Sequence, residues 1–513
     1  MYSNIKSASI LGINAYVIEI ECHIENAIPN FVIVGLPDSA VKESRERVTA
    51  AIKNSDLLFP QKKITINLAP ADIRKEGSAF DLPIALGILR AMENVQQDLI
   101  PETLFLGELS LDGTLRTVHG VLSIALEARN SGYKRIVLPA DNADEAALVD
   151  EMEVIPVNNL KEAVNFLNKE IEIQPRKVNI QEIFINNQSK NILDISDVKG
   201  QENVKRALEV AAAGGHNILM IGPPGSGKTM LAKRIPTILP PLTIDESLET
   251  TKIHSVAGAL PEKEALVTVR PFRSPHHTIS DAALVGGGMN KIKPGEISLA
   301  HHGVLFLDEL PEFARNVLEV LRQPLEDKHI NISRTKMSIE YPANFMLVCS
   351  MNPCPCGNFG NPSQECTCTP TMIKKYLSKV SGPLLDRIDI HVEVPAVKYQ
   401  DLSSKRRGEP SEEVRKRVVK ARHIQQERFK KSKNKFKNAD MTSKDLHKYC
   451  ILDESSQALL KIAMTKLGFS ARAYDRILKV ARTIADLAEE ENIRTEHISE
   501  AIQYRSLDRE YWK

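Results

Sequence analysis

The segment Ile218-Leu-Met-Ile-Gly-Pro-Pro-Gly-Ser-Gly-Lys-Thr229 decides the fold of this chain. Its first four residues are apolar and predict a short buried strand. The residues that follow fit the pattern G-x-x-x-x-G-K-[ST] at every required position, and they are Gly222, Pro223, Pro224, Gly225, Ser226, Gly227, Lys228 and Thr229. A helical pattern from Met230 to Ile235 comes next. A strand, a glycine-rich loop and a helix in this order predict a phosphate-binding loop.

The chemistry of this loop predicts ATP and Mg²⁺ as cofactors. Glycines allow backbone N–H groups to close around phosphate oxygens, and the following helix turns its positive end toward the same anion. We expect Lys228 to reach the β- and γ-phosphates and the hydroxyl of Thr229 to complete the Mg²⁺ shell. A chance glycine-rich turn is the weaker alternative, because a strand and a helix flank the loop as the motif requires.

Two further strands predict the rest of a nucleotide site. The apolar run 304–307 ends in Asp308 and Glu309, which we expect to hold Mg²⁺ and to activate the attacking water, respectively. The run 345–351 ends in Asn352, whose amide can polarise that water without adding charge. Each feature alone has a plainer interpretation, a surface turn for the acidic pair and a turn-forming residue before proline for the asparagine. Beside a phosphate loop, the acidic pair is predicted to be catalytic.

The pattern along the 513 residues predicts an α/β fold in several domains. In residues 1–168, β-branched runs alternate with helical patterns, which indicates a compact α/β domain. Residues 169–196 are mostly polar, show no helical period and predict a linker. Residues 197–395 alternate strand and helix, as an ATPase core with a parallel sheet requires. Residues 396–513 hold a basic segment and then amphipathic helices.

The composition limits the kinds of binding partner and the cellular compartment that we expect. The formal net charge is +1, from 67 Lys and Arg against 66 Asp and Glu, so any nucleic-acid contact must come from local patches. The N-terminus lacks the layout of a signal peptide, and apolar runs such as 82–89 are far shorter than the about 20 residues that cross a bilayer. The odd count of seven cysteines does not fit a secreted disulfide framework. We therefore expect a cytoplasmic protein with no membrane segment.

The motifs resemble the AAA+ branch that contains the magnesium-chelatase motor subunit and the MCM helicases. The closest resemblance is to the YifB/ComM family of magnesium-chelatase-like AAA+ ATPases, and it extends over nearly the whole chain. It rests on the segments Gly200-Gln-Glu, Lys205-Arg-Ala-Leu, Ala211-Ala-Ala-Gly-Gly-His-Asn217, Arg273-Ser-Pro-His-His-Thr278 and Ser381-Gly-Pro-Leu-Leu-Asp-Arg387. The resemblance implies an AAA+ P-loop core followed by a C-terminal helical lid.

The resemblance also implies a homo-oligomeric ring, usually hexameric in relatives. Arg387 resembles a finger that reaches the ATP of the neighbouring subunit, and such a residue would be useless in a monomer. Arg472 resembles the sensor arginine of the helical lid, and Arg476, one turn further on, is the competing residue. For each arginine, a solvated or ion-paired role is the alternative.

Three segments of the first domain resemble the Lon-protease-like domain that the family shares with the recombination protein RadA. They are Ile33-Val-Gly-Leu-Pro-Asp38, Leu68-Ala-Pro-Ala-Asp72 and Phe80-Asp-Leu-Pro-Ile-Ala85. A Lon-type peptidase needs a serine that a lysine activates. Leu122 stands at the lysine position, and the nearby Ser78 has no evident lysine partner. We therefore expect a non-proteolytic scaffold that helps to assemble the ring or to guide DNA.

Two elements are candidates for DNA contact. Residues 405–437 carry 14 Lys and Arg against 4 Asp and Glu and could track phosphates, with a solvated charged helix as an equal alternative. Residues 330–340 alternate around Arg334-Thr-Lys336 and predict a hairpin with a basic tip. In the helicases that the chain resembles, a hairpin at this place lines the pore. The long interval between Lys228 and Asp308 resembles an insert that projects toward the pore.

Two kinds of cluster raise the question of a further metal. Two C-x-C pairs follow Asn352, and their residues are Cys354, Cys356, Cys366 and Cys368. Four thiolates could bind Zn²⁺ in a closed tetrahedral site that staples a loop, and free thiols are the alternative because C-x-C is less diagnostic than C-x₂-C. The pairs His276-His277 and His301-His302 are expected to point apart and to serve hydrogen bonding or packing.

Together these features predict an ATP-hydrolysing ring motor. The resemblance implies an ATP-driven DNA translocase, and within that class a branch-migration helicase that acts on recombination intermediates, with branched or single-stranded DNA as its partner. A magnesium-chelatase-type metal-insertion motor and an ATP-dependent protein remodeller are the alternatives. The sequence shows no evident porphyrin pocket for the first, and Leu122 weakens a proteolytic version of the second.

Overall fold

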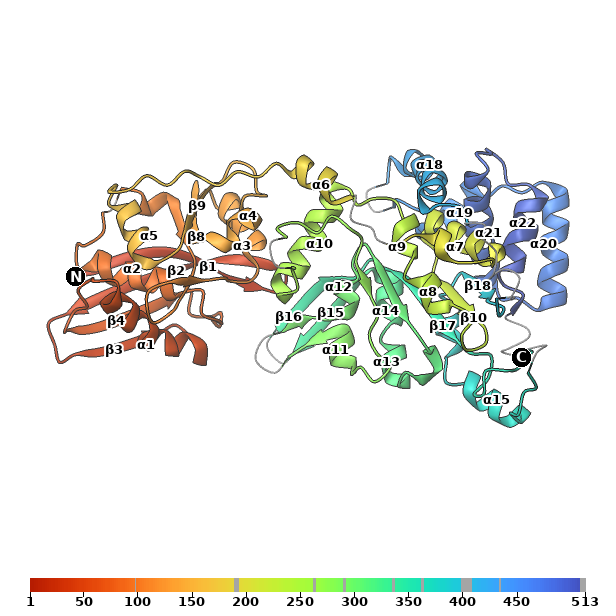
Figure 1. The fold of residues 1–513 in the computed structure, drawn as a ribbon, viewed down its shortest axis with the longest axis horizontal. Coiled ribbons are helices and arrows are strands. Elements are labelled where there is room, and N and C mark those ends of the chain that lie inside the picture. The colour runs from red at the N-terminus through yellow and green to blue at the C-terminus, as the bar shows by residue number, and fades with distance from the viewer. Residues whose placement is uncertain are drawn as a thin grey trace.

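The computed structural model describes residues 1–96, 98–188, 193–261, 264–288, 292–334, 337–360, 364–397, 408–432 and 435–507. The chain forms three parts in a row: an N-terminal α/β domain, a central α/β core and a C-terminal helical region (Figure 1). The predicted α/β fold class, with a parallel sheet in the core and helices at the C-terminal end, is confirmed.

A mixed seven-stranded sheet organises the N-terminal domain. Its strands, in spatial order, are β3 (Asn30–Val34), β4 (Lys63–Ala69), β2 (Asn14–Glu25), β1 (Tyr2–Leu11), β5 (Thr103–Phe105), β8 (Arg135–Pro139) and β9 (Glu153–Val157). The β1–β2 and β2–β4 pairs are antiparallel, and the other neighbours are parallel. Its helices are α1 (Ser39–Asn54), α2 (Asp81–Ala91), α3 (Val121–Asn130), α4 (Ala143–Ala146) and α5 (Leu160–Leu167), beside the short ribbon β6 (Glu108–Leu109) and β7 (Leu115–Arg116). The apolar run 82–89 belongs to α2, which is buried along nearly its whole length.

Helix α6 (Ile180–Gln188) lies in the segment that the sequence predicted to be a linker without a helical period. Ile180, Ile183 and Phe184 pack against the apolar core of the first domain, and Leu248 of the core's helix α10 (Ile244–Ala257) packs there too. The prediction of a period-free linker is therefore wrong at this point. Three apolar residues at positions i, i+3 and i+4 are enough for one amphipathic face, but polar neighbours hide the pattern.

A five-stranded, all-parallel sheet forms the middle of the core. Its spatial order is β11 (Phe272–Arg273), β14 (Val304–Leu307), β17 (Met346–Met351), β10 (Ile218–Ile221) and β18 (Ile390–Glu393). All residues of the three central strands are buried, as expected for a sheet covered on both faces. Helices around it include α7 (Glu202–Gly214), α13 (Arg315–Glu319), α14 (Arg322–Asp327), α15 (Pro370–Leu377) and α16 (Gly382–Leu385).

The helix after the phosphate loop is shorter than the sequence pattern predicted. Helix α8 spans Lys228–Ala232, and a separate short helix, α9, spans Ile235–Ile238. The predicted helix from Met230 to Ile235 is thus wrong at its C-terminal end. Pro236 explains the break, because proline lacks the N–H for the helical bond to Ala232.

The interval between the phosphate loop and the acidic pair holds an insert that docks the first domain. Besides α10 it contains α11 (Asp281–Val285), β12 (Gly286–Gly287), β13 (Lys293–Pro294) and α12 (Glu296–Leu299). Helix α10 packs against α3 of the first domain. There the backbone N–H of Gly120 donates to the hydroxyl of Ser255 at 2.9 Å, and that hydroxyl donates to the buried carboxylate of Glu145.

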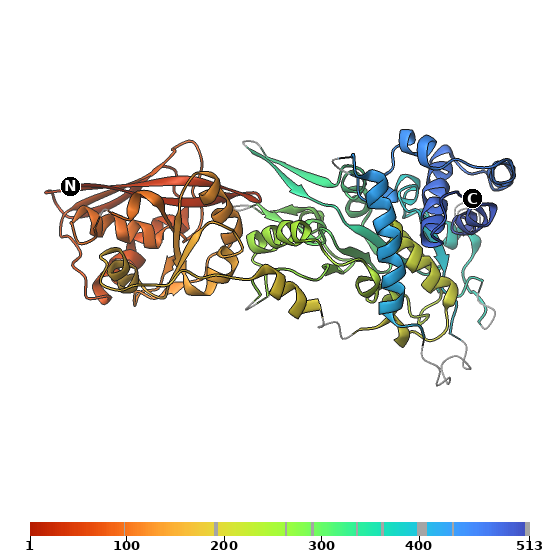
Figure 2. The same ribbon diagram turned by 90° about the horizontal axis from the view of Figure 1, so that it is seen from above.

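The predicted hairpin is present as β15 (His329–Arg334) and β16 (Met337–Pro342). It stands away from the core and extends toward the first domain (Figure 2). The turn between β1 and β2 lies close to it, because a Cβ added to Gly12 would lie 2.6 Å from Cγ2 of Ile339. Thr335 and Lys336, the predicted basic tip, lie outside the described residues.

The C-terminal region is helical and packs against the core. Its helices are α18 (Ser411–Phe429), α19 (Ser443–Tyr449), α20 (Glu454–Leu467), α21 (Ala471–Leu487) and α22 (Thr495–Gln503). Both α18 and α21 lie against α7 and share one apolar cluster with strands β10 and β18. This region therefore contacts the sheet that carries the phosphate loop.

Candidate active site

The carboxyl ends of three adjacent parallel strands carry the predicted nucleotide-site residues. The glycine-rich loop follows β10, the acidic pair follows β14, and Asn352 follows β17. Ile221 lies opposite Met351, and Leu307 lies opposite Cys349, so the three ends meet at one edge of the sheet. Ligands of open parallel sheets bind at this kind of edge.

The ammonium group of Lys228 reaches both the glycine-rich loop and Asn352. Its Nζ donates to the carbonyl oxygens of Gly222 at 2.7 Å and Pro223 at 2.9 Å, and to Oδ1 of Asn352 at 3.2 Å. An ammonium group has three N–H donors, so all of them are engaged. Burial lowers the pKa of Lys228, while the charges of Asp308 and Glu309 oppose that shift. Phosphate oxygens would replace the carbonyl oxygens as acceptors.

The glycines of the loop leave room for phosphates. Gly225 and Gly227 have φ of +75° and +89°, which favour glycine, and no atom of the described chain lies within 4 Å of a Cβ built on either residue. Gly222 is needed for a different reason, because its Cβ would lie 2.1 Å from the carbonyl oxygen of Val394. The loop thus presents backbone around open space, which fits the triphosphate of ATP.

Asp308 is held by three hydrogen bonds. The hydroxyl of Thr229 donates to its Oδ2 at 2.7 Å, and the N–H of Glu309 donates to its Oδ1 at 3.1 Å. The hydroxyl of Ser350 also donates to Oδ1. Thr229 and Asp308 are therefore adjacent, as a shared Mg²⁺ would require. Ser350 did not stand out in the sequence, although a serine within an otherwise apolar, buried strand is a usable signal.

Glu309 adopts backbone geometry that is uncommon for its residue type. Its φ is +54°, in the left-handed region, and its side chain is 55% exposed. Residues other than glycine are rarely found there, and such residues concentrate at functional sites. The ring of His277 approaches its carboxylate, with Nδ1 3.8 Å from Oε2.

Gln201 supports the phosphate loop from behind, a role that the residue-level prediction missed. Its Nε2 donates to the carbonyl oxygens of Ser226 at 2.8 Å and Pro395 at 3.0 Å. It joins the loop to the segment after β18. No local pattern marks Gln201, and only the family-like segment Gly200-Gln-Glu pointed to it.

The three arginines that the family resemblance singled out differ in their surroundings. Arg387 is buried and paired with Glu326, and its Nη1 donates to the carbonyl oxygen of Pro383 at 2.6 Å. Arg476 forms a 2.7 Å ion pair with the buried Asp389. The side chain of Arg472 is 63% exposed and lies 3.5 Å from Asp386. Arg472 is thus freer to contact a ligand than Arg476, whereas Arg387 must exchange partners to do so.

The histidine pairs do not point apart, so that part of the prediction is wrong. The ring centroids are 4.1 Å apart in His276-His277 and 4.0 Å apart in His301-His302. Side chains alternate only on extended strands, and these pairs lie in turns, with φ of +54° at His302. The second pair donates to Glu249, and the N–H of Asn344 donates to Nδ1 of His301 at 3.0 Å. That leaves Nε2 of His301 carrying the hydrogen, so it is no metal ligand here.

The described part of the basic segment serves mainly to hold the helical region. Arg417 pairs with Glu209 at 2.5 Å and Glu409 at 2.6 Å, and Arg428 pairs with the buried Asp486 at 2.5 Å. Other partners are acidic side chains or carbonyl oxygens, namely for Lys416, Lys420, Arg422, Lys430 and Lys435. These contacts favour a structural role for α18 over phosphate tracking.

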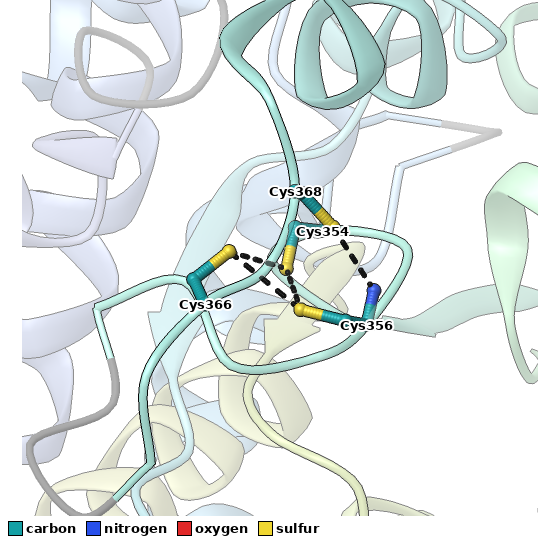
Figure 3. Close-up of side chains that lie close together, drawn as sticks. All are labelled: Cys354, Cys356, Cys366 and Cys368. Atoms are coloured by element: carbon teal, nitrogen blue, oxygen red, sulfur yellow. Dashed lines mark hydrogen bonds between the residues drawn. The ribbon is translucent and has the colours of Figure 1, made fainter.

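The four cysteines after β17 come together in one cluster (Figure 3). The Sγ atoms of Cys354 and Cys356 are 3.4 Å apart, and both lie 3.6 Å from Sγ of Cys366. Sγ of Cys368 accepts from the N–H of Cys356 at 3.4 Å. All four sulfurs lie within 4.8 Å of one another, and none is in a disulfide.

The first domain shows no serine–lysine pair at the positions expected for a Lon-type peptidase. The hydroxyl of Ser78 donates to the carboxylate of Glu108. Leu122 is fully buried, and its N–H donates to Glu145 at 2.8 Å. Lys75 is buried nearby in the sequence, but its Nζ donates to the carbonyl oxygens of Pro70 and Ile73.

Comparison with known proteins places the whole chain in one group. Family models described as subunit ChlI of magnesium chelatase match residues 20–142 and 194–402, and the model of the ChlI C-terminal part matches residues 408–505. The chain is 45% identical to the competence protein ComM of Haemophilus influenzae over 507 residues, which covers 98% of this chain and 97% of that protein. It is 45% identical to YifB of Escherichia coli, over 99% and 97% of the two chains. The 38 kDa magnesium-chelatase subunit of Rhodobacter capsulatus is 22% identical over 42% of this chain and 62% of its own.

The parallel sheet and the residues at its edge define a P-loop ATPase of the AAA+ type, whose cofactors are ATP and Mg²⁺. The chain belongs to the ComM and YifB family of magnesium-chelatase-like proteins. None of the helices among the described residues is long and apolar enough to span a membrane.

Proposed function

We propose that this ATPase is a ring-forming motor that moves along or remodels DNA, and that branched recombination intermediates are its substrate. The observation that carries the proposal is full-length similarity to a competence protein. A hairpin that stands away from the ATPase core supports it, because its predicted tip is basic. The docked first domain acts as a scaffold, since Ser78 and Leu122 form no peptidase pair.

The nucleotide site works through seven residues. Lys228 balances the phosphate charge, while Thr229 and Asp308 would hold Mg²⁺, which would stabilise the charge on the transferring phosphoryl group. Glu309 orients the attacking water and takes its proton, and Asn352 polarises that water from the neighbouring strand. Arg387 of one subunit completes the site of the next, and Arg472 senses the nucleotide from the helical region.

The test is ATP-dependent movement of a four-strand DNA junction. We expect ATP hydrolysis to rise when DNA is added, and wild-type protein to move the junction. The Lys228→Ala variant should do neither, while its oligomeric state in the absence of nucleotide stays the same. No stimulation by DNA together with no Lys228-dependent movement would refute the proposal.

A metal-insertion motor is the second candidate, because the matched family models carry the name of magnesium chelatase. The chelatase relative covers less than half of this chain, which makes this candidate the weaker one. It requires a porphyrin acceptor, so ATP hydrolysis stimulated by a porphyrin and not by DNA would favour it.

We also propose Zn²⁺ as the ion of the four-cysteine loop. A tetrahedral site with Zn–S bonds of about 2.3 Å has sulfur–sulfur edges of about 3.8 Å. The observed separations of 3.4 and 3.6 Å are close to that value. Protein purified under reducing conditions should contain about one zinc per chain, and the Cys366→Ser variant should contain much less. A wild-type protein without metal would refute this proposal.

A further inference from the structure

The four-cysteine loop lies directly against the phosphate loop. Gly357, one residue after Cys356, has φ of +83°, and its backbone faces the ring of Pro224. A Cβ added to Gly357 would lie 2.4 Å from Cδ and 2.7 Å from Cγ of that proline. Real Cβ atoms do not approach other atoms so closely, so the two loops are already in full contact. Any shift of the cysteine loop toward or away from Pro224 would reach the phosphate-binding backbone.

The same loop also returns to Asn352. Helix α15 begins directly after Cys368, with Thr369 as its N-cap, and carries the buried Tyr376. Burial raises the pKa of Tyr376, and the nearby backbone N–H of Asn352 opposes that shift, so the tyrosine hydroxyl faces the backbone of Asn352. Asn352 in turn accepts from Nζ of Lys228. Both ends of the cysteine loop therefore lie at the residue that is predicted to polarise the attacking water.

The cysteine loop is irregular over its described residues. Between residues 352 and 370 the described chain forms neither helix nor strand. Its aromatic residue, Phe359, is 41% exposed and contributes little apolar burial. Ordering such a loop costs conformational entropy, and a metal bound by four thiolates can offset that cost.

We propose that the metal-held cysteine loop braces the ATP site. One Zn²⁺ closed by four thiolates keeps Gly357 against Pro224 and Tyr376 against Asn352, so nucleotide affinity depends on a metal that does not touch ATP. The cysteines, Gly357 and Tyr376 are positioning residues in this arrangement. The inference rests on the proposed Zn²⁺ site and is independent of the proposed action on DNA.

The first experiment measures nucleotide binding with and without the metal. Wild-type protein is stripped with a chelator under reducing conditions, its zinc content is measured, and its affinity for a fluorescent ATP analogue is titrated. We expect affinity to fall about tenfold or more and to recover when Zn²⁺ is added back. If protein shown to be free of zinc binds the ATP analogue with unchanged affinity, the proposal that the zinc-bound loop supports the ATP site is overturned.

The second experiment separates the contact from the metal with a matched pair of glycines. Gly357 and Gly360 lie in the same loop, with φ of +83° and +77°, so alanine carries a similar backbone cost at both. Among the described residues, no atom lies within 4 Å of a Cβ built on Gly360. Both alanine variants should keep their zinc, but Gly357→Ala should bind the ATP analogue about tenfold more weakly than Gly360→Ala. Equal affinities would refute the contact with Pro224.

The outcomes distinguish the proposals from one another. A wild-type protein without zinc refutes the proposed Zn²⁺ site, and with it the proposal that zinc supports ATP binding. If zinc is present but Gly357→Ala and Gly360→Ala bind the ATP analogue equally well, only the proposed support of the ATP site is refuted. A failure to move DNA junctions, with both nucleotide results as expected, affects only the proposed action on DNA.

Discussion

The guanidinium of Arg387 is paired with the carboxylate of Glu326 in the same chain. The side chain of Arg387 is 9% exposed, whereas that of Glu326 is 55% exposed, so the pair lies at the rim of the protein. A residue that completes a neighbour's ATP site has to leave this partner. If Arg387 completes a neighbour's ATP site as proposed, Glu326 competes with ATP for its guanidinium, and that competition can be measured.

We predict that ATP hydrolysis requires residues from two subunits. Lys228→Ala and Arg387→Ala variants should each be inactive, because each lacks one half of the ATP site at every interface between two subunits (called a seam below). Mixing them in equal amounts should restore up to about a quarter of wild-type turnover, since random assembly pairs an intact Lys228 with an intact neighbouring Arg387 at one seam in four. The measurement is steady-state phosphate release after subunit exchange.

The control for this experiment removes the possibility of a mixed seam. Lys228→Ala mixed with a Lys228→Ala/Arg387→Ala double variant contains no intact Lys228, so it should stay inactive. Glu326→Gln should lower the ATP concentration needed for half-maximal turnover, because Arg387 loses its competing anion. Full turnover by Arg387→Ala alone would contradict the shared site.

We predict that Glu309→Gln abolishes turnover but preserves nucleotide binding. The amide keeps the shape of the side chain but cannot take a proton, and losing a general base costs about 10²- to 10⁴-fold in rate. Single-turnover hydrolysis and equilibrium ATP binding measure the two effects separately. Glu312→Gln is a suitable control, because Glu312 lies three residues away and pairs with Lys379 at 3.3 Å. A similar rate loss in both variants would argue against a specific role for Glu309.

The nucleotide site could be located from the sequence because its signals are local. The glycine-rich loop before Lys228, and the residues Asp308 and Asn352, each follow directly on a recognisable apolar strand, and parallel pairing brings strand ends to one edge. Ser350 and Gln201 could not be assigned in the same way. Their partners depend on which strands are neighbours and on the path of the chain after β18. No local sequence pattern predicts either of these.

The errors differ in physical origin. The end of α8 depends on a single proline, Pro236. The apolar pattern around this proline predicts a longer helix than the chain forms. Helix α6 forms because three side chains find a core to pack on, and that core belongs to another part of the chain. The Glu326 partner of Arg387 lies far away in the sequence, so only the folded chain shows that this arginine is engaged.

We predict that His301 makes stability fall on mild acidification. Burial lowers its pKa to about 4, His302 adds to that shift, and Glu249 opposes it. An unfolded histidine titrates near 6.5. Between these values the unfolded chain binds more protons than the folded one, so stability present at pH 7 is lost as the pH falls. From pH 7 to pH 5 this group should cost about 2 kcal/mol.

The measurement is unfolding as a function of pH for wild type and His301→Gln. Glutamine can still accept from the N–H of Asn344 but does not titrate, so the variant should lose less stability between pH 7 and 5. His447→Gln, at an exposed position in α19, is the control and should follow the wild type. Parallel pH curves for wild type and His301→Gln would contradict the prediction.

We predict that the hairpin and α18 respond in opposite ways to loss of a positive charge. Lys336→Ala, at the predicted tip of the hairpin, should reduce the salt slope of DNA binding by about 1 and leave thermal stability unchanged. Arg417→Ala should leave that slope unchanged and lower stability by about 1–2 kcal/mol, because it removes a partner of the buried Glu209. The measurements are binding at several salt concentrations and thermal unfolding.

The two variants discriminate because each removes one positive charge, so a general electrostatic attraction would affect them equally. Only a specific contact with phosphate releases counterions at one position and not at the other. A lower salt slope for Arg417→Ala, with no change for Lys336→Ala, would place the DNA along α18. In that case Arg417 would have to leave Glu209 and Glu409 when DNA binds, and the double variant Glu209→Gln/Glu409→Gln should then bind DNA more tightly.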